Sequence, residues 1–213
     1  FVAVEGVYSM DGDLAPLKEI RELCDRFRAV LIVDDAHGTA VMGETGGGTA
    51  EHFGIKGRVD LAMGTFSKAF GTTGGFLAGK KELISYLRFY SRSYMFSAHL
   101  PPPVVAAVLG GLEVIAREPE RLRRVHENAE YLASGLRALG YPVTREAAIL
   151  PILVPESVDM RALSRAFHEA GVFINSVEYP AVARDAQRLR ISVMATHTRE
   201  DLDEALSVFE RLG

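Results

Sequence analysis

Short, almost continuous apolar runs that end in polar or small residues constrain the fold of this chain more than any other feature. Val30–Val33 is one such run and Leu61–Met63 is another, and segments with helical apolar periodicity lie between such runs. Strands that are apolar along both faces are typical of parallel sheets covered by helices on two sides. The alternation therefore predicts an α/β fold with a mainly parallel, doubly wound sheet.

The pattern divides the chain into two predicted domains near Glu118. Residues 1–118 contain expected strands at 1–5, 30–34, 60–66 and 74–79, and expected helices at 14–27, 80–90 and 101–117. Residues 119–213 form a predicted small α+β domain, with strands at 149–154, 172–175 and 189–193, and helices at 122–140, 160–170 and 199–212. Because the first residues already have the pattern of a strand, we expect the C-terminal part of a longer protein.

Two of the predicted helices carry more specific expectations. The helix at 14–27 has an apolar face whose members are Leu17, Ile20, Leu23 and Phe27. Cys24 is expected to be a core residue on that face. Thr198, followed by Asp201 three residues later, has the spacing of a capping pair for the last helix. The glycine-rich segment Gly43–Gly48 is expected to be a surface loop.

Composition excludes several classes of protein. The chain has 213 residues, of which 48% are hydrophobic, enough to bury a substantial core. A net charge of −4 with dispersed basic residues gives no support for nucleic-acid binding. A single cysteine favours a reducing compartment. No apolar run is long enough to span a bilayer, so we expect a cytoplasmic protein without stable membrane insertion.

Two of the predicted strands deliver reactive side chains to one edge of the sheet. The first ends in Asp34 and is followed by His37, and the second is followed by Lys68. Open α/β sheets bind ligands at the carboxyl ends of their strands. Lys68 could be a surface lysine, Asp34 a turn residue and His37 a core histidine. A buried amine next to an acid instead suggests imine chemistry on an organic cofactor.

Metal and nucleotide sites fit this sequence poorly. Asp35-Ala36-His37 resembles part of the metal-binding run of arginase-like hydrolases, but Thr39 occupies the position that needs a second acid. Gly71–Gly75 is neither a dinucleotide fingerprint nor a phosphate-binding loop. We therefore predict no metal site and no nucleotide fold of those types.

Five ordered motifs together resemble a known enzyme family. They are Glu5-Gly6-Val7-Tyr8-Ser9-Met10-Asp11-Gly12-Asp13, Asp34-Asp35-Ala36-His37-Gly38, Thr65-Phe66-Ser67-Lys68, Phe96-Ser97-Ala98-His99-Leu100-Pro101-Pro102 and Arg188-Leu189-Arg190-Ile191. The chain resembles the α-oxoamine synthases, which are pyridoxal-phosphate-dependent enzymes of fold type I. This group includes 8-amino-7-oxononanoate synthase, serine palmitoyltransferase, 5-aminolevulinate synthase and 2-amino-3-ketobutyrate CoA ligase.

The resemblance implies roles around the cofactor, pyridoxal 5'-phosphate. Lys68 matches the Schiff-base lysine of the family. Asp34 matches the residue that pairs with the pyridine nitrogen, and His37 matches the residue that contacts the phenolic oxygen. Ser9 and Thr65 match positions that contact the oxygen and the phosphate of the cofactor.

Two further residues are implied in substrate binding and dimer formation. Arg190 matches the arginine that holds the substrate carboxylate, a task suited to a bidentate guanidinium. Ser97 matches a residue that reaches the phosphate in the neighbouring subunit, so a homodimer with shared active sites is implied. The resemblance covers essentially the whole chain, but nothing in it matches the upstream half of the family.

The implied reaction is condensation of a small amino acid (serine, alanine or glycine) with an acyl-CoA thioester, usually with decarboxylation and with release of CoA. Thr196 stands where many members carry alanine, and we expect it to influence substrate choice. Gly74–Phe76 and Asn175–Pro180 are similar to serine palmitoyltransferase-like members. Two alternatives stay open: an aminotransferase of the same fold, and a non-catalytic fragment that acts as a dimerisation module.

Overall fold

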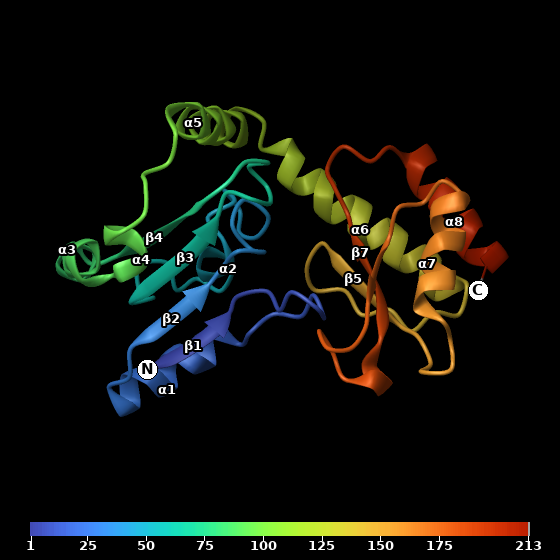
Figure 1. The fold of residues 1–213 in the computed structure, drawn as a ribbon, viewed down its shortest axis with the longest axis horizontal. Coiled ribbons are helices and arrows are strands. Elements are labelled where there is room, and N and C mark those ends of the chain that lie inside the picture. Colours follow the sequence, from blue (N-terminus) through green and yellow to red (C-terminus); the bar gives the residue numbers. More distant parts are fainter. Residues whose placement is uncertain (213) are drawn as a thin grey trace. The chain divides into compact units, whose positions relative to one another are not determined.

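The computed structural model describes residues 1–212 and consists of two compact units (Figure 1). Unit 1 contains Phe1–Tyr8 and Leu14–Leu122, and unit 2 contains Ser9–Asp13 together with the chain from Arg123 onwards. A five-residue segment from the start of the chain thus belongs to the unit formed by its last part. The domain boundary predicted near Glu118 stays a prediction.

Unit 1 is built on a four-stranded sheet with the order β1-β2-β3-β4. Its strands are β1 (Val2–Glu5), β2 (Leu31–Asp34), β3 (Leu61–Thr65) and β4 (Gly75–Gly79). The first three strands are parallel, and β4 is antiparallel to β3. The sheet is therefore mostly parallel, as the apolar runs predicted, with one antiparallel edge strand.

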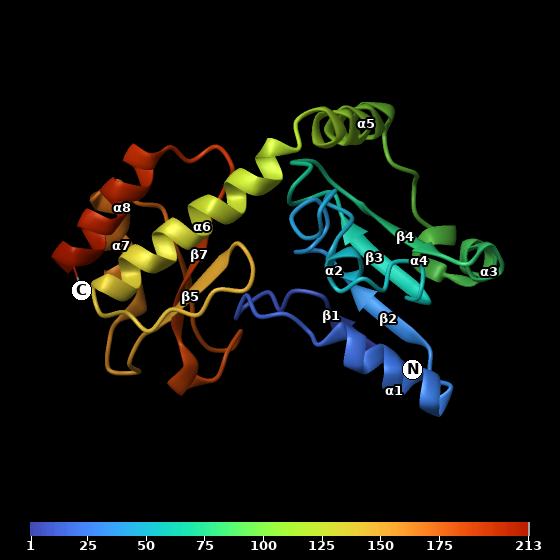
Figure 2. The same cartoon turned by 180° about the vertical axis from the view of Figure 1, so that it is seen from behind.

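Helices accompany this sheet in unit 1 (Figures 1 and 2). They are α1 (Leu17–Phe27), α2 (Thr49–His52), α3 (Lys81–Tyr90), α4 (Arg92–Met95) and α5 (Pro102–Arg117). The sequence pattern predicted α1, α3 and α5 to within three residues at each end. It missed α2 and α4, because a four-residue helix is too short to show a period.

The buried face of α1 differs from the predicted one. Cys24 is buried as expected, but Leu23 is 53% exposed and Phe27 is 71% exposed. Arg21 lies on the buried face instead, at 5% exposure, because its guanidinium is paired with Asp60 and Asp25 at 2.8 Å each. A buried arginine is stable when its charge is paired in this way. The period of apolar residues alone does not reveal that Arg21 is buried.

Unit 2 contains a three-stranded antiparallel sheet with the order β5-β7-β6. The strands are β5 (Ile149–Leu153), β6 (Asn175–Val177) and β7 (Arg188–Ser192), and a 3-10 turn at Arg184–Ala186 precedes β7. The helices are α6 (Glu120–Ala138), which begins in unit 1, α7 (Met160–Glu169) and α8 (Arg199–Leu212). The core of unit 2 includes Leu136, Leu150, Phe167 and Phe209.

One strand of unit 2 is displaced from its predicted position at 172–175. The chain after α7 turns at Gly171 with a φ of +91°, and the amide of Val172 donates to the carbonyl of Phe167 at 2.9 Å. This local closure keeps Phe173 out of the sheet, at 80% exposure. The strand therefore starts only at Asn175.

The capping pair predicted for α8 is present. The amide of Thr198 donates to a carboxylate oxygen of Asp201 at 2.8 Å, and the amide of Asp201 donates to the Thr198 hydroxyl at 3.2 Å. Among residues 1–212, no helix has both the length and the apolar character needed to cross a bilayer.

Candidate active site

Four of the predicted site residues lie at one edge of the sheet in unit 1. Asp34 is the last residue of β2 and Thr65 is the last residue of β3, and the two strands are parallel neighbours. His37 follows Asp34 by three residues, and Lys68 follows Thr65 by three residues, each in a turn. The strand ends therefore bring a carboxylate, an imidazole, a hydroxyl and an amine to a common edge, where parallel sheets place their ligands.

The turn that carries Asp34 and His37 is organised by its other acid, Asp35. One oxygen of the half-buried Asp34 accepts the amide of Ala36 at 3.0 Å. Asp35 is 6% exposed and accepts both the amide and the hydroxyl of Thr49 at 2.8 Å. Burial raises the pKa of Asp35, and the two bonds from Thr49 act in the opposite direction.

Glycines make room for the Asp35 carboxylate. A Cβ atom at Gly6 would lie 2.5 Å from an oxygen of this carboxylate, and Cβ atoms at Gly38 and Gly48 would also collide with it. Asp35 is therefore a structural residue enclosed by backbone. Within residues 1–212, no group of three or more histidine, cysteine, aspartate or glutamate side chains is arranged to hold a metal ion.

The turn after β3 presents Lys68 at the surface of the chain. Gly71 donates its amide to the carbonyl of Lys68 at 2.9 Å, and Thr72 donates to the carbonyl of Phe66 at 2.9 Å. Lys68 itself is exposed. The expectation of a buried amine is therefore wrong for the described chain, because β3 ends at Thr65 and the turn carries Lys68 beyond the sheet.

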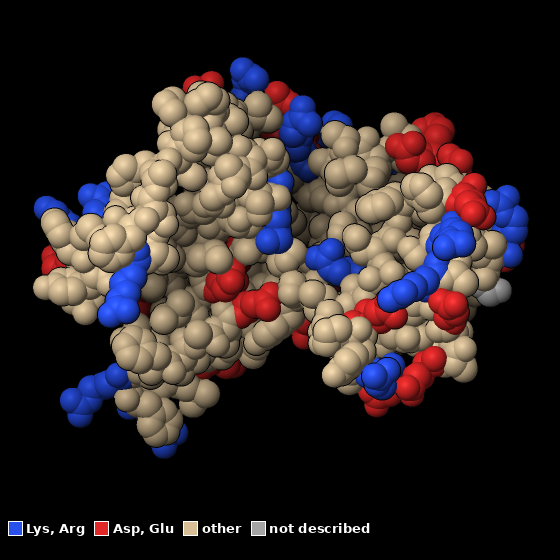
Figure 3. All heavy atoms as spheres, in the orientation of Figure 1, with Lys and Arg blue, Asp and Glu red and all other residues tan. Residues whose placement is uncertain are grey.

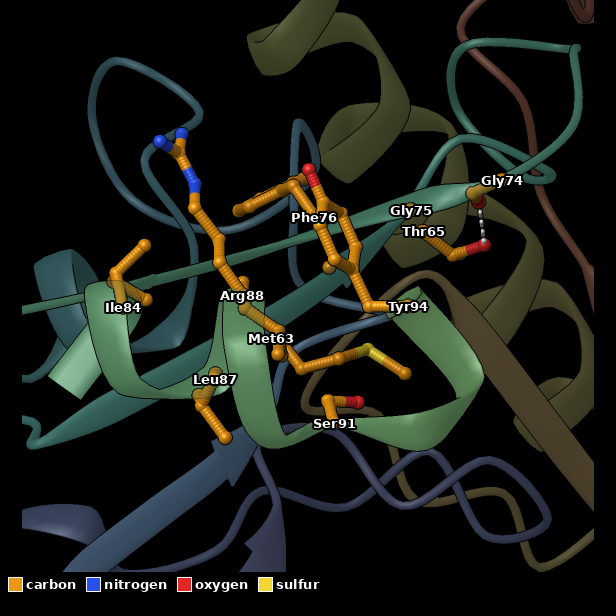
Figure 4. A pocket seen from close by; sticks show the side chains of 12 residues that line it. Met63, Thr65, Gly74, Gly75, Phe76, Ile84, Leu87, Arg88, Ser91 and Tyr94 are labelled. Carbon is orange, nitrogen blue, oxygen red and sulfur yellow. Dashed lines mark hydrogen bonds between the residues drawn. The ribbon is translucent and has the colours of Figure 1, made fainter. Parts of the chain in front are cut away.

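The hydroxyl of Thr65 is held in place beside an apolar cavity. It donates to the carbonyl of Gly74 at 3.1 Å, shown as a dashed line in Figure 4, and its oxygen lies 2.8 Å from that of Ser67. The cavity has a volume of about 500 Å³ and lies beside β3, β4, α3 and α4. Met63, Phe76 and Tyr94 contribute to its lining, as does Thr65, and Lys68 and Asp34 are not part of that lining.

Ser97 lies in the same unit, in the exposed segment after α4, with its amide 3.5 Å from the carbonyl of Tyr94.

Acidic and basic side chains are interspersed over the face shown in Figure 3, with apolar and neutral residues between them.

The other two predicted residues, Ser9 and Arg190, belong to unit 2, where they contact each other. Arg190 is the central residue of β7 and pairs with Pro151 of β5 and Asn175 of β6 in the register of the sheet. Its Nε donates to the carbonyl of Ser9 at 2.5 Å, and its Nη1 donates to the Ser192 hydroxyl at 3.0 Å. Burial lowers the pKa of Arg190, although an arginine side chain stays charged in proteins.

Sequence reasoning missed a second arginine on β7. Arg188 is 6% exposed, and its guanidinium donates to the carbonyl of Ala186 at 2.9 Å and to that of Met10 at 3.3 Å. It also forms an ion pair with Asp11. The sequence feature that could have revealed Arg188 is its spacing of two residues from Arg190, because alternate residues of a strand point to the same face. Arg188, Arg190 and Ser192 therefore share one face of β7.

Comparisons with known proteins identify the family of this chain. The profile of the family described as "Aminotransferase class I and II" matches residues 1–209. The chain therefore belongs to the aminotransferase class I and II family.

Within this family the chain is similar to 8-amino-7-oxononanoate synthases and serine palmitoyltransferases. It is 43% identical over 213 residues to the 8-amino-7-oxononanoate synthase of Thermosipho melanesiensis, which covers 100% of this chain and 54% of that protein. It is 43% identical over 211 residues to 8-amino-7-oxononanoate synthase 1 of Bacillus subtilis, covering 99% of this chain and 54% of that one.

A solved structure of serine palmitoyltransferase with bound pyridoxal phosphate has the same fold. It superposes with a TM-score of 0.94 at 34% identity, covering 99% of this chain and 54% of the other. The α/β fold and the resemblance to α-oxoamine synthases inferred from the motifs are thereby confirmed. The chain spans about half the length of the curated relatives that it matches.

Proposed function

We propose that the protein containing this chain is a pyridoxal-phosphate-dependent α-oxoamine synthase. It condenses a small amino acid (serine, alanine or glycine) with an acyl-CoA thioester and releases CoA, usually with decarboxylation. The observation that carries the proposal is the placement of Asp34, His37, Thr65 and Lys68 at the ends of two adjacent parallel strands. The similarity of the whole chain to 8-amino-7-oxononanoate synthases supports the choice of reaction within the family.

The donor groups at this edge match the chemistry of the cofactor. Lys68 offers the amine that would hold its aldehyde carbon, and Asp34 offers the carboxylate that would keep a pyridine nitrogen protonated. His37 would hydrogen-bond the phenolic oxygen, and Thr65 the phosphate. When bound, the cofactor supplies an electron sink for a carbanion at Cα of the amino acid.

The residues of the chain would then act on the substrates directly. The Lys68 amine would take the proton from Cα of the amino acid as a general base. Arg190 would bind the substrate carboxylate through N–H groups that its bonds to Ser9 and Ser192 do not use. This contact would orient the amino acid for attack on the thioester carbonyl.

We further propose a homodimer with shared active sites, in which Ser97 reaches the phosphate in the neighbouring subunit and Ser9 contacts the oxygen of the cofactor. Both roles are carried over from the family motifs at these positions. A cytoplasmic location stays a prediction from the sequence.

Product analysis tests the reaction. The purified holoenzyme, containing the complete polypeptide, is supplied with serine, alanine or glycine and with acyl-CoAs of graded chain length, and release of free thiol is followed. Thiol release that depends on both substrates is expected. Formation of a 2-oxo acid without thiol release would instead identify an aminotransferase, and absence of both products would favour a non-catalytic module.

Replacing Lys68 tests the assignment of the base. We expect Lys68→Ala to lower the rate of thiol release by at least ~10²-fold, the effect expected for removal of a positioned general base. Lys18→Ala, at an exposed position of α1, is the matched control and should leave the rate unchanged. Thiol release by Lys68→Ala within a few-fold of the wild-type rate would refute the role of Lys68.

A further inference from the structure

The segment Ser9–Asp13 is the tip of a hairpin-like excursion that belongs to unit 2. The base of the excursion lies in unit 1, where Val7 and Leu14 form an antiparallel bridge and Ala15 donates its amide to the carbonyl of Gly6 at 3.2 Å. We call Ser9–Asp13 the tip loop. The tip loop follows β1 of unit 1 along the chain, but it belongs to unit 2 and its side-chain contacts are with β7 of that unit. Its conformation therefore depends on side chains of β7.

Arg188 contacts two adjacent residues of the tip loop. Its buried guanidinium pairs with Asp11 and donates to the carbonyl of Met10 at 3.3 Å, while its Nε donates to Ala186 on its own strand at 2.9 Å. Gly12 lies against β5, where a Cβ atom would collide with the carbonyl oxygen of Ile149. The loop is thus fixed at three consecutive residues by a planar, multidentate donor and a close backbone contact.

Arg190, two residues further along the same face of β7, depends on the position of that loop. Its Nε donates to the carbonyl of Ser9 at 2.5 Å, and Ser9 is the residue before Met10, which Arg188 holds. A guanidinium is planar, so a bond at Nε fixes the direction of its remaining N–H groups. A shift of Ser9 would therefore rotate the part of Arg190 that is left to bind a ligand.

We propose that Arg188 is a positioning residue for substrate binding: it holds the tip loop so that Arg190 presents its guanidinium to the α-carboxylate of the amino acid. The inference rests on the proposed function, because it takes the ligand of Arg190 to be that carboxylate. Arg188 itself is not placed in contact with substrate. Its Nε is directed to Ala186, and its Nη1 is directed to Met10 and Asp11.

Steady-state kinetics of the complete holoenzyme test this proposal. Arg188→Met is expected to raise the KM for the amino acid roughly tenfold, with the KM for acyl-CoA changed by less than about twofold, since the substitution disturbs the binding of the carboxylate and not that of the thioester. Arg161→Met is the matched control, because Arg161 is 85% exposed and lies outside the tip loop. It should leave every constant unchanged.

A double-mutant cycle separates positioning from a general loss of structure. In an enzyme that already carries Arg190→Met, adding Arg188→Met should raise the amino-acid KM no further, because the residue through which Arg188 acts is gone. Multiplicative effects of the two substitutions would overturn the proposal. An equal rise in the KM values of both substrates would overturn it as well.

Hydrogen exchange gives a readout that does not depend on turnover. In Arg188→Met we expect faster amide exchange in the tip loop at residues 9–13, with β5 exchanging at the wild-type rate. Unchanged exchange in the tip loop would overturn the proposal. If Arg188→Met does not fold, Asp11→Asn removes the same ion pair from a 56% exposed position and should act in the same direction.

The outcomes for this inference and for the proposed function are distinguishable. If the wild-type enzyme releases no thiol from any acyl-CoA, the proposed function fails. The double-mutant cycle then uses the dissociation constant of the amino acid, measured by equilibrium dialysis, in place of its KM. If the wild type releases thiol but Arg188→Met leaves the amino-acid KM and tip-loop exchange unchanged, only the present inference fails.

Discussion

Asp34 and Asp35 are adjacent in the chain but have opposite environments. Asp34 is half-buried at the sheet edge, with one oxygen bonded to the amide of Ala36 at 3.0 Å. Asp35 is enclosed, and both of its oxygens accept hydrogen bonds from Thr49. Asp35 thus organises the turn, and Asp34 is the acid that is presented to a ligand. Substitution of Asp35 should disturb the structure of the turn, whereas substitution of Asp34 should disturb ligand binding.

Glu51 plays a similar organising role for the glycine-rich loop Gly43–Gly48. It accepts the hydroxyl of Thr45 at 2.8 Å and the amides of Thr45 and Gly47 at 3.0 and 2.9 Å. The hydrogen bond from the Thr45 hydroxyl is the largest cause that lowers the pKa of Glu51 to about 2, from 4.5. The loop, expected only to lie at the surface, is therefore closed by a specific carboxylate.

This arrangement predicts a pH-dependent contribution to stability. A carboxylate with a lowered pKa in the folded state stabilises the fold above its unfolded-state pKa, here 4.5, and loses that contribution as the pH falls towards 2. We expect Glu51→Gln to lower the free energy of unfolding by about 1–2 kcal/mol at pH 7, on the scale of hydrogen bonds to a charged group. Urea unfolding at several pH values measures the difference.

The difference between Glu51→Gln and wild type should shrink between pH 4.5 and pH 2.5. Glu44→Gln, at an exposed position of the same loop, serves as the control and should show no such dependence. A difference that stays constant across this range would show that the charge of Glu51 contributes nothing.

At the scale of elements, the two adjacent glycines of α5 have different surroundings. Gly110 is exposed, and a Cβ atom there would meet nothing within 4 Å, whereas a Cβ atom at Gly111 would lie 2.7 Å from Cδ1 of Phe70. In a helix, alanine is favoured over glycine by roughly 0.5–1 kcal/mol when the new methyl group meets no obstacle. Alanine at position 110 can therefore stabilise α5, whereas alanine at position 111 cannot do so without displacing Phe70.

We therefore expect Gly110→Ala to raise the free energy of unfolding by about 0.5–1 kcal/mol. Gly111→Ala should lower it or leave it unchanged, because the ring of Phe70 must move to admit the methyl group. Chemical denaturation of the two variants side by side measures the contrast. Equal stabilisation by both would show that Phe70 does not pack closely on α5.

An element could be predicted from the sequence where the residues that determine it are close together in the chain. The strands β2 and β3 were predictable because their apolar runs and their polar ends are contiguous in sequence. The buried face of α1 was not, because Arg21 is buried through a partner, Asp60, that lies 39 residues away. The start of β6 was misplaced because the bond between Val172 and Phe167 is a feature of backbone geometry.

At the scale of the whole molecule, the sheet of unit 1 has an exposed edge. All five residues of β4 are exposed, and Leu77 in its middle is 46% exposed. Apolar side chains on helices of unit 1 are also exposed, including Phe89 of α3 at 72% and Leu109 of α5 at 57%. An edge strand with unpaired backbone groups beside apolar surface favours association with other chains.

We expect a polypeptide consisting only of residues 1–213 to self-associate in a concentration-dependent manner. Leu77→Lys should weaken the association by at least about tenfold, since a charge on an edge strand opposes pairing. Met194→Lys, at a 54% exposed position outside any strand, is the control and should have no effect. Sedimentation velocity measures the change, and a strictly monomeric wild-type polypeptide would contradict the prediction.

The candidate site shows the same limit of sequence reasoning. Its placement at one sheet edge followed from the ends of two strands, which sequence reveals directly. The exposure of Lys68 did not follow, because the length of the turn after β3 is not evident from the apolar run. The buried contacts of Arg188 did not follow, because they depend on residues far away in sequence. Arg188 could be suspected only from its spacing of two to Arg190, and its partner Asp11 is 177 residues away.

That separation has a consequence for synthesis on the ribosome. The tip loop is translated before β7, whose side chains hold it, so it has none of these partners until the chain has grown by about 177 more residues. At about 5–20 residues per second, the delay is roughly 9–35 seconds. The segment bearing the serine proposed to touch the cofactor would thus reach its folded conformation well after its own translation, accessible to proteases and chaperones in the meantime.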